Sequence, residues 1–218
     1  MKKIFTLLSF SFLFLTSSQA QIKKGATFLG GNIGASSGKT TSTNVGNNLN
    51  QSQKGVSFSP VFGKAIKENI VVGVNGLYSS RKTDFEGDFN DSKEKTYGFG
   101  FFIRKYKQLG KGGFSIFLQG ELGGDYYKRD QGSITIIKDE YKQFGIRINV
   151  YPGISYSISK RLQLESGLTN LIAIGYNKGK GERTGVQTSS YESESFNVYS
   201  SLENLSSFYF GFRLLLNK

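Results

Sequence analysis

Apolar and polar residues alternate with a period of two along most of this chain, and this alternation restricts its fold more than any other feature. In the segment 97–104 the odd positions carry large apolar side chains, whereas Arg104 takes an even position. The segments 114–122, 144–150 and 208–214 repeat the pattern, and Arg147 and Arg213 lie on their polar faces. A period of two belongs to β-strands, whereas a helix repeats every 3.6 residues. The sequence therefore predicts an all-β protein.

The connections between the alternating segments differ in length. Three are short, at 64–69, 107–112 and 157–161, and four are long and polar, at roughly 37–54, 81–95, 128–140 and 177–204. Seven connections imply about eight strands. Short turns on one side and long loops on the other are typical of outer-membrane proteins. We therefore predict an antiparallel up-and-down transmembrane β-barrel of about eight strands, with short periplasmic turns and long external loops. Ser166 and Asn170 interrupt the apolar face of 162–176, which predicts a bulge near Gly167.

The polar faces decide which side of the barrel is lumen. A soluble barrel is apolar inside and polar outside, which would direct Arg147 and Arg213 toward water. In a membrane, an arginine directed toward lipid at mid-span costs about 2–4 kcal/mol. We therefore expect the apolar faces to contact lipid. Four tyrosines on these faces predict one rim of an aromatic girdle: Tyr78, Tyr97, Tyr126 and Tyr176. Three further aromatic residues are expected on the same face near the short turns: Phe62, Phe114 and Tyr156.

The lumen is predicted to be filled rather than open, because eight strands leave room only for side chains. Its polar faces carry a candidate ion network of five residues: Arg104, Glu121, Arg147, Glu165 and Arg213. Charges buried in this way are expected to pair, because each isolated charge would cost several kcal/mol. We interpret the network as structural, and a proton or ion relay is the alternative.

The N-terminal residues predict export. Lys2 and Lys3 precede an apolar stretch, and Ser18 and Ala20 flank Gln19 with small residues. This is the pattern of a signal peptide spanning residues 1–20, with the barrel domain in 21–218. An uncleaved anchor is the alternative, but the stretch is shorter than the ~20 residues of a spanning helix. The predicted location is the outer membrane of a Gram-negative bacterium.

Composition argues against catalysis. The chain has no His and no Cys, so the usual imidazole and thiolate chemistry has no residues to act. We expect no enzyme activity, no cofactor and no metal site. One acidic stretch offers oxygen ligands that suggest Ca²⁺ as an alternative, although ion-paired surface charge is the preferred interpretation; it comprises Asp84, Glu86, Asp88, Asp91 and Glu94.

The net charge of +12 is not interpreted as a nucleic-acid signal, because no basic helix or groove is predicted. Seven basic residues instead cluster at the short turns, where they are placed to reach lipid headgroups. They are Lys64, Lys67, Lys105, Lys107, Lys111, Lys160 and Arg161.

Three segments carry a resemblance to a known family. They read SPVFGKAIKENIVVGVNGLY, YPGISYSISKRLQLESG and FYFGFRLLL. In these the chain resembles the outer-membrane β-barrel proteins of the porin family, including small OmpA/OmpX-like and PorT-like barrels. The resemblance implies assembly in an outer membrane and a role in attachment, envelope integrity or secretion. Such barrels commonly end on an aromatic residue, whereas this chain ends on Lys218.

The preferred function is that of a non-catalytic outer-membrane barrel that acts through its external loops. Its expected partners are outer-membrane lipid and an external ligand or protein, and the barrel is expected to be a monomer. The alternatives are a narrow passive channel for small solutes or ions, an outer-membrane hydrolase or acyltransferase, and a soluble secreted barrel.

Overall fold

The computed structural model describes residues 22–44, 47–85, 91–132, 138–168, 171–185, 187–200 and 208–216. Within these ranges it is all-β, and no helix is long and apolar enough to cross a bilayer. The strands are β1 (Thr27–Asn44), β2 (Asn47–Lys67), β3 (Ile70–Phe85), β4 (Asp91–Leu109), β5 (Phe114–Gly132), β6 (Lys138–Ser157), β7 (Leu162–Leu168), β8 (Ile172–Thr184), β9 (Ser189–Tyr199) and β10 (Phe208–Leu216).

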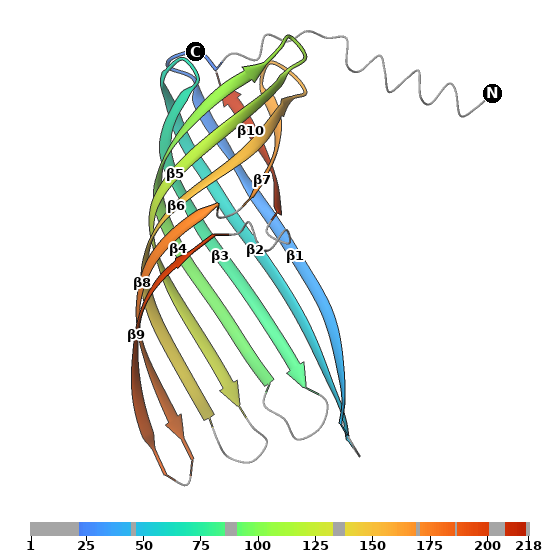
Figure 1. Ribbon diagram of the computed structural model, residues 1–218, viewed down its shortest axis with the longest axis vertical. Helices are drawn as coiled ribbons and strands as arrows, with labels where there is room; N and C mark the ends of the chain where they lie inside the picture. The colour runs from blue at the N-terminus through green and yellow to red at the C-terminus, as the bar shows by residue number, and fades with distance from the viewer. Residues whose placement is uncertain are drawn as a thin grey trace, which may run out of the picture.

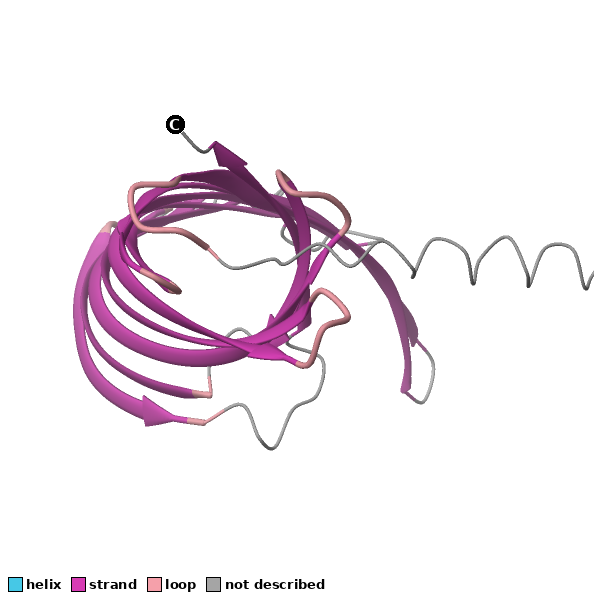
Figure 2. Cartoon of the chain, turned by 90° about the horizontal axis from the view of Figure 1, so that it is seen from above, coloured by secondary structure: helices cyan, strands magenta, loops and turns pink. Residues whose placement is uncertain are grey.

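These segments form a closed antiparallel barrel of eight strands (Figure 1 and Figure 2). Strands β1 to β6 follow one another as hairpins. Strand β6 pairs with β7 through Gly153–Ser157 and with β8 through Lys138–Val150, so β7 and β8 are two parts of one barrel strand. In the same way β9 pairs with β8, and β10 pairs with β7. The barrel closes where β10 pairs with β1 over Thr27–Asn32.

The strand interruption lies beyond the predicted bulge position. Gly167 itself pairs in register with Gly153, so the register change predicted near this residue does not lie at the glycine. The register instead changes between Leu168 and Ile172. On β6, Ile154 pairs with Ser166 of β7, and Val150 pairs with Ile172 of β8, which is a shift of two residues. A shift of two residues preserves the side on which each side chain lies. For this reason Leu164 and Ile172 still share the outer face.

The four stretches expected to be long external loops are mostly strand, which corrects the prediction. The β1–β2 ladder runs to Asn44 and Asn47, and the β4–β5 ladder runs to Asp91 and Gly132. Both faces of these extensions are polar, so the sequence shows no alternation of hydrophobicity there. Ladder hydrogen bonds and cross-strand ion pairs hold them together instead, for example Arg81 to Glu94 at 3.5 Å.

The outer face of the barrel is apolar, as the alternation predicts. Phe101, Ile148 and Ile154 are 61%, 51% and 54% exposed, whereas Phe102 and Phe117 on the opposite face are buried. The predicted girdle residues Tyr78, Tyr97, Tyr126 and Tyr176 all face outward. Tyr78 and Tyr97 lie side by side, with ring centroids 5.5 Å apart. At the other end of the barrel, the rings of Phe114 and Tyr156 are 4.6 Å apart. The strands continue beyond the tyrosines, so the tyrosine row lies within the strands rather than at their ends.

The extensions are not closed into a ring along the described chain. Beyond Asn32, β1 has β2 as its strand partner, and β9 has β8. The β1–β2 and β8–β9 hairpins end on opposite sides of the lower edge in Figure 1. The molecule therefore combines a closed barrel at the end of the short turns with a curved sheet at the other end.

Candidate functional site

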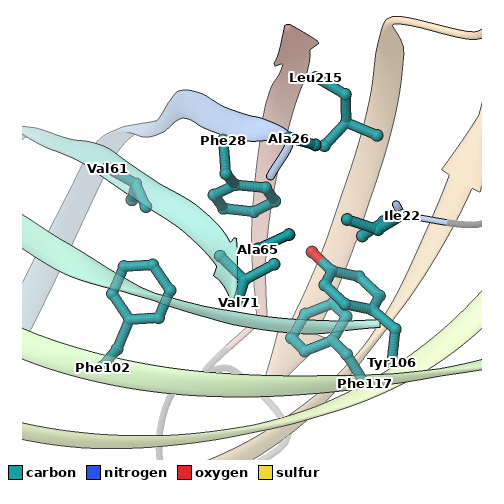
Figure 3. Close-up of a cluster of buried hydrophobic side chains, with 10 residues drawn as sticks. All are labelled: Ile22, Ala26, Phe28, Val61, Ala65, Val71, Phe102, Tyr106, Phe117 and Leu215. Carbon is teal, nitrogen blue, oxygen red and sulfur yellow. The ribbon is translucent and has the colours of Figure 1, made fainter. Parts of the chain in front are cut away.

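The candidate site is the barrel interior, where the inward positions of eight strands meet. An apolar cluster fills the half near the short turns (Figure 3). Its members include Phe28 from β1, Phe102 and Tyr106 from β4, and Phe117 from β5. Ile22, which precedes β1, packs into the same cluster and donates its backbone N–H to the Asn69 side chain at 3.3 Å. The lumen is consequently filled at this end rather than open.

A buried carboxylate between two guanidinium groups lies against this apolar cluster. Glu165 Oε1 is 2.6 Å from Arg104 Nη1, and Glu165 Oε2 is 3.0 Å from Arg213 Nη2. The side chains of the two arginines are 1% exposed and that of Glu165 is 0% exposed. We call these three residues the ion cluster. The alternation places each of them inward, and the barrel's closure brings β4, β7 and β10 to one point.

Neutral groups also form hydrogen bonds to the ion cluster. The Tyr106 hydroxyl accepts a hydrogen bond from Arg104 Nη1 at 2.9 Å and donates one to Glu165 at 2.8 Å. Arg104 Nε donates to Gln119 Oε1 at 2.6 Å, and Arg213 donates to the Gly31 carbonyl at 3.1 Å. The guanidinium of Arg104 also lies 4.2 Å from the ring centroid of Phe117. Aromatic faces and hydrogen bonds offset part of the cost of burying two cations with one anion.

Glu121 and Arg147 lie in a second polar cluster, farther from the short turns along the lumen. Glu121 accepts hydrogen bonds from Asn75 at 2.8 Å and from Tyr151 at 3.3 Å. Arg147 lies 3.8 Å from Glu121, but its closer partner is Asp125, which it contacts through Nη1. Gln119 joins the two clusters, because it accepts from Arg104 and donates to Glu121 at 3.3 Å.

The structure thus brings the five predicted residues into one connected network with two centres. Arg104, Glu165 and Arg213 form one centre, and Glu121 and Arg147 belong to the other. Sequence reasoning missed Tyr106 and Gln119 as ligands of the charges and Asp125 as the partner of Arg147. Their even or odd positions place all three inward, so the alternation contained a usable signal.

A polar cavity of about 690 Å³ lies on the side of the network away from the short turns. Glu121, Arg147 and Tyr151 line it together with residues of β1, β2 and β3. The apolar cluster and the ion cluster separate this cavity from the short-turn end. The lumen is therefore hollow on one side, where charged and polar side chains line it, and packed on the other.

A cation site would need several acidic side chains close together. No group of three Asp or Glu side chains among the described residues is placed to hold a metal ion. In the suggested Ca²⁺ stretch, Asp84 pairs with Lys82 and Glu94 pairs with Arg81, while Glu86 and Asp88 lie outside the described residues. The predicted signal peptide also lies outside them.

Comparisons with known proteins give a likeness in structure but no family. No protein family model matches the sequence, and no curated protein matches it significantly. Among solved structures, the chain is similar to the crystal structure of a major outer membrane protein from Thermus thermophilus. The TM-score is 0.46 at 10% sequence identity, covering 88% of this chain and 99% of that one. A likeness of this degree carries no conclusion about what this chain does.

Proposed function

We propose that this chain is a non-catalytic outer-membrane barrel with a closed lumen, which acts through the sheet that its strands extend beyond the membrane. The observation that carries the proposal is the inverted polarity of the barrel. Large apolar side chains cover its outside, and ionised side chains occupy its inside. Soluble monomers rarely expose contiguous apolar patches larger than a few hundred Å². A lipid environment is the one in which this distribution is stable.

The dimensions of the apolar outer face agree with a bilayer. On β5 the outward positions from Ile116 to Tyr126 carry no charge. Ten residues at ~3.4 Å each, tilted by about 40°, span about 25 Å, which is the height of the lipid-facing band of outer-membrane barrels. Charged side chains lie beyond both ends, for example Lys128 on one side and Lys111 on the other.

The filled lumen supports a structural or attachment role over conduction. An ion crossing the barrel would have to pass the Arg104–Glu165–Arg213 contacts and the apolar cluster around Phe28. Both faces of the strand extensions beyond the tyrosine row are polar. This is the surface that would bind a ligand or a protein partner. A secretion accessory role would use the same surface.

Two measurements on the purified protein test this proposal. In SDS gels the unboiled protein should run faster than the boiled protein, because a closed barrel resists detergent. In planar bilayers the folded protein should give no steady single-channel openings. Absence of the gel shift together with recovery in the soluble fraction would overturn the membrane assignment. Steady openings would overturn the closed lumen and favour a narrow passive channel.

Single cysteines test the orientation, because the natural chain has none. Ser190→Cys on β9 should react with a membrane-impermeant maleimide on intact cells. Lys111→Cys, in a short turn, should react only after the outer membrane is permeabilised. The reverse pattern would place the extended sheet on the periplasmic side and refute an external role for it.

A further inference from the structure

The outer face of the barrel is not smooth. Across β4, β5, β6 and β7 it is hollowed into a groove of about 890 Å³. Small or compact residues form its floor, namely Gly120, Pro152 and Ser166. Larger side chains form its walls, among them Ile103, Leu118 and Ile154. The register places these residues on adjoining rows, since Ile103 faces Gly120, and Ile154 faces Ser166. The lining is apolar apart from Ser166, Tyr106 and two lysines.

Gly120 is the residue that keeps this groove open. A Cβ at position 120 would meet only one neighbour within 4 Å, the Cγ2 of Ile103 at 3.7 Å. The glycine is therefore not required by close packing, unlike Gly73, where a Cβ would overlap backbone atoms. A larger side chain would fit at position 120 and would fill the groove. In lipid, an unfilled groove forfeits contacts on one side, so an acyl chain that follows it gains dispersion energy.

Two lysines border the groove at the end nearer the short turns. Lys105 and Lys107 alternate outward along β4, opposite Leu118 and Ile116. Neither has an ion-pair partner among the described residues. They precede the turn at Gly110 by five and three residues, which is about 13 and 8 Å along the barrel axis. Ammonium groups at this depth reach the headgroup layer of the nearer leaflet.

We propose that the groove is a binding site for one anionic phospholipid of the periplasmic leaflet. An acyl chain lies over Gly120 and Pro152, and the headgroup phosphate lies between Lys105 and Lys107. Each lysine near a membrane surface attracts anionic lipid, and two lysines beside an apolar groove select for both parts of such a molecule. A second copy of the chain is a poorer occupant, because a symmetric contact across this face would bring the lysines of both copies together. This inference rests on the membrane-spanning arrangement proposed above.

The chain has no tryptophan, so a single introduced one reports on its surroundings without background. Ile154→Trp places the reporter in the groove. Ile148→Trp is the matched control, because both isoleucines face outward on β6 with similar exposure and Ile148 does not line the groove. Each variant is reconstituted into vesicles of equal parts phosphatidylglycerol and phosphatidylcholine. Bromine is carried on the acyl chains of one lipid or of the other, and quenching of fluorescence is measured.

For Ile154→Trp we expect quenching at least about threefold stronger when phosphatidylglycerol carries the bromine. For Ile148→Trp the two preparations should quench equally. Adding Lys105→Gln with Lys107→Gln to the groove reporter should abolish the preference. Adding Gly120→Leu should abolish it as well, although both lysines remain. The heat-dependent gel shift confirms that every variant is folded before it is compared.

The possible failures are separable. Equal quenching of Ile154→Trp by the two lipids would overturn the lipid site while leaving the membrane barrel intact. A preference that survives removal of both lysines would also overturn it. Protection of Ile154→Trp from both lipids, with Ile148→Trp quenched, would indicate a protein in the groove instead. Absence of quenching at both positions would show that the barrel is not inserted, which would overturn the proposed function itself.

Discussion

At the scale of single residues, the interior depends on one carboxylate. Glu165 is the only acidic partner of Arg104 and of Arg213 among the described ion pairs, and all three side chains are sealed from solvent. Breaking a buried ion pair leaves an uncompensated charge, which costs more than the pair contributes when intact. Glu165 is therefore the position where a small chemical change should have the largest effect.

Glu165→Gln should lower the free energy of unfolding by about 3–5 kcal/mol, because both arginines lose their counter-charge with almost no change in volume. Urea titration of the folded protein in lipid vesicles, followed by the gel shift, measures this change. Glu194→Gln is the control, since its pair with Lys178 at 2.8 Å has side chains 58% and 55% exposed. Exposed pairs contribute about 0–1 kcal/mol. Equal unfolding midpoints for the two variants would refute the importance of the ion cluster.

A second prediction at this scale concerns Gly73 on β3. A Cβ there would lie 2.6 Å from Gly63 Cα and 2.8 Å from the Phe102 ring, and closer still to the Phe62 carbonyl. Gly73→Ala should therefore destabilise the barrel by about 1–3 kcal/mol, the usual cost of overpacking. Gly38→Ala on β1, where nothing lies within 4 Å, should change the same urea midpoint little. A Gly73→Ala protein as stable as Gly38→Ala would contradict the close approach of β2 and β3.

At the scale of elements, the sequence predicted the strands wherever one face contacts an apolar environment. Alternation fixes the side on which Phe101, Arg104 and Ile148 lie, and the structure agrees for each. It fails for the polar stretches, because Ser, Thr, Asn and Lys occupy both faces of β1 and β2 beyond the tyrosine row. There the backbone hydrogen bonds of the ladder hold the strand, and the hydrophobicity pattern of the sequence does not predict it.

The site was predictable only in part, for a related reason. Alternation shows that Glu165 and Arg104 point inward, but not that residues 61 positions apart lie at one depth. Depth follows from the registers of the β4–β5, β5–β6 and β6–β7 ladders, which polar residues do not reveal. The strand register also determines that Arg147 lies closer to Asp125 than to Glu121.

Hydrogen exchange distinguishes extended strands from loops. Residues Tyr127–Gly132 of β5 pair with β4 on one side and β6 on the other, so their amides should exchange at least about tenfold more slowly than unstructured ones. In β9, which pairs with β8, every second amide should exchange rapidly. Residue-resolved exchange by NMR in micelles measures both. Rapid exchange throughout Tyr127–Gly132 would restore the loop interpretation.

The pKa of Glu140, in the β5–β6 hairpin, is also predicted to be shifted. Glu140 lies 2.9 Å from Lys142 and 3.2 Å from Lys128, and these ammonium groups lower its pKa to about 2. A lowered pKa means that the contribution to stability is present above the ordinary value of 4.5 and is lost as the pH falls through about 2. Carboxyl NMR should show Glu140 ionised at pH 3.5, and Lys142→Gln should raise its pKa. An unshifted Glu140 would mean that these contacts do not persist in solution.

At the scale of the whole molecule, closure depends on a short seam. Strand β10 pairs with β1 over only Thr27–Asn32, whereas the β1–β2 ladder runs from Thr27 to Asn44. Arg213 reinforces the seam from inside, because it donates to the Gly31 carbonyl and to Asn32 Oδ1, each at 3.1 Å. Closure and the ion cluster are therefore coupled: Arg213 belongs to both, and a barrel that fails to close also leaves Glu165 without one of its partners.

A pair of introduced cysteines tests closure directly, because the natural chain contains none. Leu29 and Leu214 face each other across the seam, and opposed residues on antiparallel strands have Cα atoms about 4.5–5.5 Å apart, within the range of a disulfide. Leu29→Cys with Leu214→Cys should therefore form a disulfide on mild oxidation of the folded protein. The bond would join the two ends of the chain, so the boiled, unreduced protein should run faster until reductant is added. Leu29→Cys with Ile146→Cys, which lies on β6 away from the seam, should not cross-link. If the seam pair also stays reduced while the gel shift shows a folded protein, β1 and β10 are not neighbours, and both the closed barrel and the burial of its ion cluster would have to be abandoned.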